Sequence, residues 1–365
     1  MLANFKKFGV AAAVAAALGA SGAAHAINIG EPGDALLIPF VYGNTTTQAN
    51  TMIGVTVIGT TQSNVSEFDT ISGVSKKYCS GAGGASNLHW YFFSIDSIHL
   101  ADGKIPASCE DFVRIDWNFL ISQNYPSVQN VPGYLVIADN AKYTSGDVAD
   151  SGVILYGSTY FVQGNWMSEA FIPVIPLYDP KAGTVGDEVT YDGIIVGDVN
   201  PVRAGMDLAS ASGETASFSL RYFVPTTSEI SGNTRFVLWF PDNEVSGGSR
   251  YNQDIVVYDA DETGRSTRTS IPYELNILSV SPTAKTDSLI TGVITDGLVN
   301  TNTDNAGITA IGPAVNTGFV VFDVNDFEGT TGSARGGVAF SLVGVGTDAN
   351  TVQVQTDLAH ERGVK

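Results

Sequence analysis

The chain has 365 residues, with 37 Asp and Glu against 18 Lys and Arg, which gives a formal net charge of −19. Charged residues make up 15% of the chain, below the roughly 25% of an average soluble domain, while apolar residues make up 44%. This acidic balance has the wrong sign for binding nucleic acid or an anionic membrane surface. The apolar content excludes a disordered chain, so we expect a folded protein whose surface consists largely of Ser, Thr, Asn, Gln and Gly.

The first 26 residues predict a secretory signal peptide. Lys6 and Lys7 precede an apolar stretch over residues 10–24, and small residues at positions 24 and 26 mark a cleavage site. The apolar stretch is shorter than the roughly 20 residues of a membrane-spanning helix, and it lacks the polar face of an amphipathic one. Cleavage after Ala26 would remove two lysines and no acid, which changes the net charge from −19 to −21. We therefore expect export to the periplasm, the cell surface or the medium, with no transmembrane helix in the mature chain.

The chain contains two cysteines, Cys79 and Cys109. In an oxidising compartment an even pair predicts one disulfide. It would close a loop of about 30 residues and add roughly 3 kcal/mol in the chain-entropy model. Two unpaired thiols are the alternative.

Beyond residue 27 the pattern is that of strands. Short β-branched and aromatic runs alternate with Gly, Pro, Asn and Asp, which is typical of an all-β sandwich or barrel. The expected strands cover residues 36–42, 52–58, 88–95, 112–119, 134–138, 153–156, 171–177, 218–224, 235–240, 255–258, 275–280, 319–322 and 338–343.

Three sequence matches predict an internal duplication with a period near 184 residues. FVYGNTTTQANT at Phe40 matches FVPTTSEISGNT at Phe223, PGYLVIADN at Pro132 matches TGFVVFDVN at Thr317, and ADSGVIL at Ala149 matches ARGGVAF at Ala334. The offsets are 183, 185 and 185 residues, far beyond the period of a solenoid. The predicted fold is all-β, with two tandem β-sandwich domains of Ig-like or jelly-roll-like type. Their predicted bounds are 27–180 and 216–365, joined by a structured linker over 181–215.

Two acidic loops are candidate calcium sites. In the first, alternate oxygen-bearing side chains precede Gly264 as in the first part of an EF-hand loop, but Ser270 stands where a bidentate Glu belongs. A solvated turn is the alternative for each loop, and no cofactor is required by the sequence. The candidate ligands are Asp259, Asp261 and Thr263 in the first loop, and Asp323, Asn325, Asp326 and Glu328 in the second.

Catalytic motifs are absent from the sequence. No G-x-S-x-G, S-x-x-K, H-E-x-x-H or P-loop pattern occurs. His89 and His99 are expected on one strand, about 33 Å apart, which is too far to chelate one ion. The four tryptophans, at positions 90, 117, 166 and 239, are expected in the core rather than stacked on a sugar.

The segments GDALLIPFV, NTMIGVTV and GYLVIADN resemble those of a group of uncharacterised secreted β-rich proteins of Gram-negative bacteria. This resemblance implies export and β structure. It implies no activity and no functional residues.

These features favour a structural or adhesive role at the cell surface or in the extracellular matrix over catalysis. Self-association is expected through exposed sheet edges, to which the leading strand over residues 34–41 would be added. Other surface components or a polysaccharide are alternative partners. A secreted carboxylate-dependent hydrolase of glycosidase type and an outer-membrane β-barrel are the alternative functions.

Overall fold

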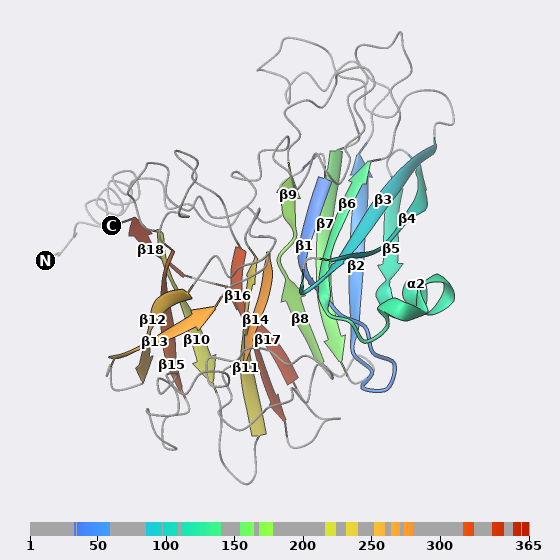
Figure 1. Cartoon of the computed structure of the whole chain (residues 1–365). Coiled ribbons are helices and arrows are strands. Elements are labelled where there is room, and N and C mark those ends of the chain that lie inside the picture. Colours follow the sequence, from blue (N-terminus) through green and yellow to red (C-terminus); the bar gives the residue numbers. More distant parts are fainter. Residues whose placement is uncertain are drawn as a thin grey trace, which may run out of the picture.

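Strands dominate the structure, a computed structural model (Figure 1). Within the residues that the structure describes, they form four antiparallel sheets, accompanied by one α-helix and one 3-10 turn. The prediction of a mostly β protein is therefore confirmed. The structure describes residue 33 and residues 35–58, 85–96, 98–108, 111–139, 154–163, 168–177, 216–223, 231–239, 252–259, 264–270, 274–279, 317–324, 338–346, 353–358 and 360–364.

The first half of the molecule, up to residue 177, contains two sheets. One has the strand order β4-β3-β6-β1-β9 and the other the order β5-β2-β7-β8. The elements are β1 (Ala35–Val41), β2 (Asn50–Ile58), β3 (Ala85–Ser94), β4 (His99–Ser108), β5 (Asp111–Asp116), helix α2 (Trp117–Asn124), the 3-10 turn η1 (Pro126–Val128), β6 (Gly133–Asp139), β7 (Ile154–Gln163), β8 (Ser168–Ile172) and β9 (Ile175–Leu177).

The second half, from residue 216 onward, also contains two sheets. Their strand orders are β13-β12-β15-β10-β18 and β14-β11-β16-β17. Adding nine to each strand number of a first-half sheet gives the matching second-half sheet. The strands are β10 (Ala216–Phe223), β11 (Ser231–Trp239), β12 (Asn252–Asp259), β13 (Gly264–Ser270), β14 (Leu275–Ser279), β15 (Thr317–Val324), β16 (Val338–Gly346), β17 (Gln353–Leu358) and β18 (His360–Val364).

A buried threonine makes the same pair of hydrogen bonds in each half. The Oγ1 of Thr51 on β2 accepts a bond from the amide of Tyr42 (2.9 Å) and donates one to its carbonyl (3.0 Å). On β11, the Oγ1 of Thr234 makes both bonds to Phe223, each at 2.8 Å. Phe223 therefore corresponds to Tyr42, so the matching Phe-Val pairs of the sequence, at 40 and 223, do not occupy equivalent positions. The Asn-Thr part of that match does.

A stacked aromatic pair also occurs in each half. Phe93 of β3 stacks on Tyr134 of β6, with ring centroids 4.9 Å apart, and Tyr258 of β12 stacks on Phe319 of β15 at 4.7 Å. In both halves a glycine precedes the second ring of the pair. A Cβ atom at Gly133 or at Gly318 would collide with the backbone carbonyl oxygen of the stacked partner. The close approach of two strands therefore requires glycine at both places.

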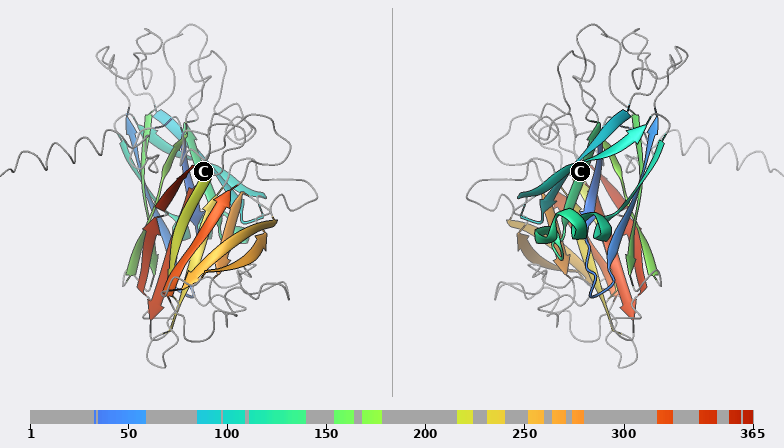
Figure 2. Two further views of the ribbon diagram at one scale, coloured as in Figure 1. Left: turned by 90° about the vertical axis from the view of Figure 1, so that its left-hand side faces the viewer. Right: turned by 90° about the vertical axis from the view of Figure 1, so that its right-hand side faces the viewer.

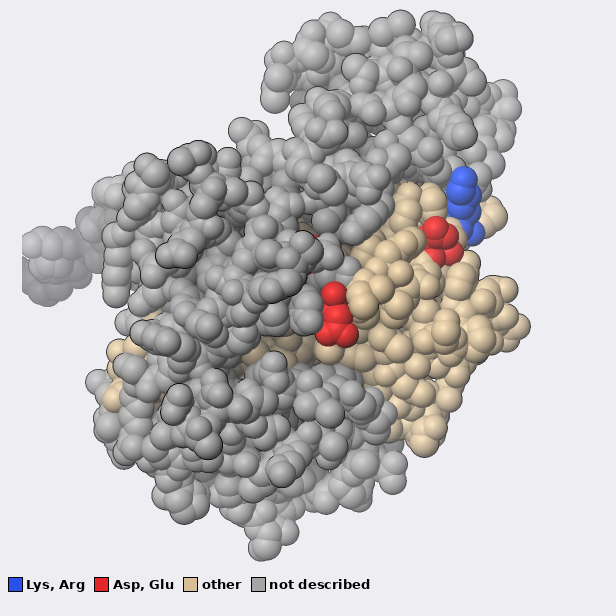
Figure 3. Space-filling model, viewed as in Figure 1, with Lys and Arg blue, Asp and Glu red and all other residues tan. Residues whose placement is uncertain are grey.

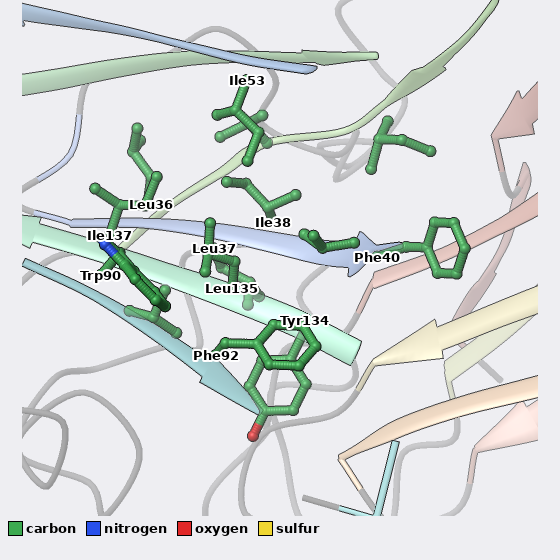
Figure 4. Close-up of a cluster of buried hydrophobic side chains, with 14 of the residues drawn as sticks. Leu36, Leu37, Ile38, Phe40, Ile53, Trp90, Phe92, Tyr134, Leu135 and Ile137 are labelled. Atoms are coloured by element: carbon green, nitrogen blue, oxygen red, sulfur yellow. The ribbon is translucent and has the colours of Figure 1, made fainter. Parts of the chain in front are cut away.

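The core continues from one half into the other. Figure 4 shows side chains of β1, β2, β3 and β6 packed together, among them Leu36, Ile53 and Trp90. The same buried cluster extends into the second half through residues of β11, β14 and β16: Val237, Trp239, Leu275, Ile277, Val338, Phe340 and Leu342. The Trp239 ring contacts the Tyr134 ring edge-on at 6.1 Å, and β17 lies alongside β8. Figure 2 shows the strands of the two halves next to one another, with α2 on the side of the first half that faces away from the second.

Helix α2 corrects one predicted strand, which was expected to run over residues 112–119. The strand ends at Asp116, whose carboxylate accepts a hydrogen bond from the amide of Phe119 and caps the helix. Trp117 and Ile121, four residues apart, form its buried side. At eight residues α2 is short, and no helix within the described ranges is long and apolar enough to cross a membrane.

The strands missed by the sequence analysis lie at sheet edges. They are β4, β13, β17 and β18, whose sequences HLADGKIPAS, GRSTRTS, QVQTDL and HERGV are mostly polar. An edge strand is buried on fewer sides, so its sequence contains fewer apolar residues. The predicted strand over 171–177 is divided into β8 and β9, which belong to different sheets.

Candidate functional site

The two described residues of the candidate calcium loops, Asp259 and Asp323, lie apart. Asp259 ends β12 and pairs with Gly318 near the start of β15, whereas Asp323 lies five residues further along β15 and pairs with Ser217. Five strand residues span about 17 Å, so Asp259 and Asp323 lie at opposite ends of β15. The other predicted ligands, Asp261, Thr263, Asn325, Asp326 and Glu328, lie outside the described residues.

The predicted disulfide also lies outside the described residues, since Cys79 and Cys109 both do. The same holds for the signal peptide over residues 1–26. Within the described ranges, no group of three or more His, Cys, Asp or Glu side chains is placed to hold a metal ion.

His89 and His99 do not lie on one strand as expected. A turn after Ser94 places His89 on β3 and His99 on β4, where His99 pairs with Phe93. Both imidazole rings flank Tyr91: the His89 ring lies 4.1 Å from it and the His99 ring 6.0 Å. His99 is opposite a residue four positions along β3 from His89, about 13 Å away, so the two histidines still cannot ligate one ion directly.

His89 is held by polar contacts on both ring nitrogens. Its Nδ1 is 2.7 Å from the hydroxyl of Tyr91, and its Nε2 is 4.0 Å from a carboxylate oxygen of Asp102. Tyr91 is 7% exposed and the Asp102 side chain 49%. An ion pair with a carboxylate this exposed contributes little to stability. The arrangement orients the imidazole between a phenol and a carboxylate on the sheet surface.

The tryptophans are core residues, as predicted, for the three that the structure describes. Trp90, Trp117 and Trp239 are at most 5% exposed. The Trp90 ring meets Trp117 edge-on at 5.7 Å. Trp166 lies outside the described residues.

Arg235 on β11 is a buried cation in the second half. It is 1% exposed, and burial lowers the pKa of its guanidinium to about 9. At neutral pH it is therefore protonated. Arg235 follows Thr234, as Met52 follows Thr51 in the first half. A charged guanidinium therefore stands where the first half has the partly exposed side chain of Met52.

An exposed aromatic surface covers one face of the sheet β5-β2-β7-β8. Thr56 on β2 pairs with Phe112 on one side and Tyr156 on the other, and Gly54 pairs with Ser158, so these side chains share one face. Phe112 is 61% exposed and Tyr160 is 41% exposed. We call this surface the aromatic face and define it by Gly54, Thr56, Phe112, Tyr156, Ser158 and Tyr160.

Local packing fixes the rings of the aromatic face. A Cβ atom at Gly54 would lie 2.8 Å from the Phe112 ring, so the absence of a side chain there lets that ring lie against the sheet. Tyr160 meets Phe171 of β8 edge-on, with ring centroids 6.1 Å apart. On the face of the molecule drawn in Figure 3, few charged side chains of the described residues are visible, whereas on the aromatic face the exposed Arg114 lies beside Gly54. Flat surfaces with exposed aromatic rings are typical of binding sites for large partners rather than of catalytic clefts.

The sequence analysis missed this face, although a signal for it exists. In DFVRID of β5, Val113 and Ile115 are buried, which places Phe112 on the opposite side with Arg114. An aromatic residue two positions from a charged one on a strand lies on the same face, which indicates an exposed ring.

The comparisons with known proteins provide no relative. No protein-family model matches the chain, and no curated protein matches it.

Proposed function

We propose that this protein is an exported structural or adhesive component of the cell surface or extracellular matrix. The observation that supports this most directly is the aromatic face, where Phe112 and Tyr160 are exposed on a sheet whose other side is buried in the core. Monomeric soluble proteins rarely leave grouped aromatic rings in water without a binding role. A flat, well-packed sheet would present those rings in fixed positions, which lowers the entropy lost on binding.

We further propose that the scaffold consists of two β-sandwiches. In each, a five-stranded sheet would pack on the four-stranded sheet of the same half. The contact between Phe40 of β1 and Phe161 of β7, at 5.6 Å, supports the pairing in the first half. In the second half, the edge-on contact between Phe236 of β11 and Phe322 of β15, at 5.9 Å, supports it.

A tandem duplication accounts for the likeness of the two halves. The described parts of both halves have nine strands in the same spatial order, and unrelated domains would not be expected to share so long an order. Thr51 and Thr234, the two stacked pairs, and Gly133 and Gly318 then occupy equivalent positions. The proposed domain bounds, 27–180 and 216–365, follow from this likeness and from the sequence matches.

Export, the disulfide and calcium binding belong to the same proposal. The signal peptide over residues 1–26 would direct export, and the oxidising compartment reached would allow the Cys79–Cys109 disulfide to form. Calcium is a candidate ligand of the two acidic loops. A calcium titration monitored by thermal unfolding tests it, because an ion that binds only the folded state raises the melting temperature.

Cell fractionation and a retention assay test the proposed function. The tagged full-length chain is expressed in its native host, and we expect it to begin at Ile27 and to sediment with the cell envelope or matrix. Purified protein added to washed cells should be retained by the same fraction. A cytoplasmic location, or free release without retention, would contradict the proposal.

A further inference from the structure

The face of the second half that corresponds to the aromatic face is buried. With Thr51 and Thr234 as the common reference, Gly54 corresponds to Val237 and Thr56 to Trp239. The strand pairings extend the match: Thr56 lies between Phe112 and Tyr156, as Trp239 lies between Leu275 and Val338. The second-half residues belong to the core cluster that they share with the first half. In this chain the second-half face is covered by the first half, whereas the first-half face is open.

Trp239 of the second half packs against a surface of the first half. That surface also has a counterpart, which lies on the second half and is open. Trp239 lies against Tyr134 of the stacked Phe93–Tyr134 pair, and both rings of that pair are 0% exposed. The equivalent pair in the second half, Tyr258 and Phe319, is partly exposed. Phe223 nearby on β10 is 40% exposed, whereas its counterpart Tyr42 is 0% exposed and packs on Phe161 of its own half.

The two open surfaces are therefore counterparts of the two surfaces that join the halves. The aromatic face corresponds to the face that contains Trp239, and the Tyr258–Phe319 pair, with the exposed Phe223 beside it, corresponds to the stacked pair that receives it. Within one chain the rings of both open surfaces are exposed or partly exposed, so the two surfaces do not cover one another. A second copy of the chain offers each surface its counterpart.

We propose that this protein associates head to tail with copies of itself. The aromatic face of one molecule docks on the Tyr258–Phe319 pair and Phe223 of the next, and so repeats between molecules the contact that joins the halves. Such a heterologous interface leaves one open surface at each end and generates linear chains unless a ring closes. This inference rests on the proposed surface or matrix role and names the partner of the aromatic face.

The charge of the protein determines how this association responds to salt. Each mature molecule would have a net charge of −21, so two copies repel one another at low ionic strength. The proposed contact is aromatic, and the exposed charges beside its rings, Arg114 on the aromatic face and Arg221 opposite Phe319, have the same sign. Added salt screens the repulsion without weakening the contact, so association should strengthen from 20 mM to 500 mM NaCl.

Sedimentation velocity of the purified mature chain over a range of concentrations tests the proposal. We expect a weight-average mass that rises with protein concentration. A first double variant, Phe112→Ser with Tyr160→Ser, removes the rings of the aromatic face, and a second, Phe223→Ser with Tyr258→Ser, removes the receiving rings. Each should weaken association by at least about tenfold, as expected for central interface aromatics. Phe119→Ser is the matched control, since Phe119 is 65% exposed on α2 and belongs to neither surface.

Mixing the two double variants distinguishes a head-to-tail contact from other modes. Each variant keeps one intact surface, so a one-to-one mixture should form dimers and stop there, while each variant alone stays monomeric. Circular dichroism melts verify that both variants fold. A wild-type chain that stays monomeric at all concentrations, a Phe119→Ser variant as impaired as the first double variant, or a mixture that forms no dimers would overturn the proposal. If the chain stays monomeric but washed cells still retain it, the head-to-tail association is wrong and the proposed function stands. The same holds if the sedimentation of a monomeric chain changes only when polysaccharide is added.

Discussion

The two halves arrange their strands in the same order but differ in which sheet faces meet water. In the second half, the face that contains Val237, Trp239 and Phe340 is buried. In the first half, the corresponding face has glycine, threonine and serine between exposed rings. The alternation of each strand decides which residues share a face. The contact between the halves decides which of those faces needs an apolar sequence.

The comparison also separates what the fold requires from what the interface requires. Features present in both halves, such as the threonine bridge and the stacked rings beside a glycine, belong to the fold. Trp239, which stands where the first half has Thr56, belongs to the contact between the halves, and helix α2 belongs to the first half's own surface. The four predictions below test this division, beginning with the largest expected effect.

Replacement of Trp239 by alanine should destabilise the protein by about 4 kcal/mol, the usual cost of the cavity left by a buried tryptophan. Trp239 is 5% exposed and lies against Tyr134 of the other half. Urea unfolding followed by circular dichroism measures the change. Thr56→Ala, at the corresponding place on the aromatic face, should change stability by less than about 0.5 kcal/mol. Equal changes of unfolding free energy in Trp239→Ala and Thr56→Ala would mean that the contact between the halves adds nothing to stability.

Gly133→Ala and Gly318→Ala should each cost about 3 kcal/mol, since the new methyl group would collide with a backbone carbonyl that cannot move without displacing a strand. Similar losses in thermal or urea unfolding are expected because the two sites are alike. Gly54→Ala is the control. Its Cβ would meet the ring of Phe112 and the hydroxyl of Ser158, which are side-chain atoms able to turn away rather than backbone, so a small effect is expected. A large loss at one of the two equivalent glycines alone would break the correspondence between the halves.

Thr51→Val and Thr234→Val should each destabilise the protein by about 2 kcal/mol, because a buried backbone amide and carbonyl would lose their partner. The side chains have nearly the same shape, so packing is preserved. Thr159→Val is the matched control: Thr159 is buried, and its Oγ1 has no hydrogen-bond partner among the described residues. This variant should be neutral or more stable. A large loss of stability at one threonine and none at its counterpart would contradict the proposed duplication.

Asp116→Ala should cost about 1 kcal/mol, because the carboxylate caps α2 and also accepts a bond from Asn50. The loss should be local, since α2 lies on the side of the first half away from the second (Figure 2). Hydrogen exchange of the α2 amides would detect it, with the second-half strands unchanged. Ser122→Ala on the same helix removes only an exposed bond to the Phe119 carbonyl and should leave exchange nearly as it was. Faster exchange in the second half would show that α2 is not confined to the first half's own surface.

Much of the fold could be predicted from the sequence, because buried strands have apolar residues at regular spacing. Alternating or continuous apolar runs identified β1, β2, β3 and β6. Polar edge strands such as β13 lacked that signal, since few of their side chains face a core. Helix α2 was missed because its buried residues, Trp117 and Ile121, occupy a single turn and also fit a strand.

The candidate site was harder to predict because it depends on strand pairing. Phe112 and Tyr156 are 44 residues apart in the sequence and share a face only because both pair with Thr56. The same holds for the contact between Tyr134 and Trp239, which no local pattern encodes. The acidic loops could be recognised because their residues are consecutive, yet only register placed Asp259 and Asp323 at opposite ends of β15.

The Tyr134–Trp239 contact also imposes an order on synthesis. Trp239 follows Tyr134 by 105 residues, so a chain made at ordinary translation rates produces the second ring about 5 to 20 s after the first. Once Leu177 has been made the first half has all its own strands, but until residue 239 follows, one of its surfaces still lacks the tryptophan that will lie against it. A newly made first half is thus a transient target for holding chaperones, and a chain truncated between the halves would keep that surface open permanently.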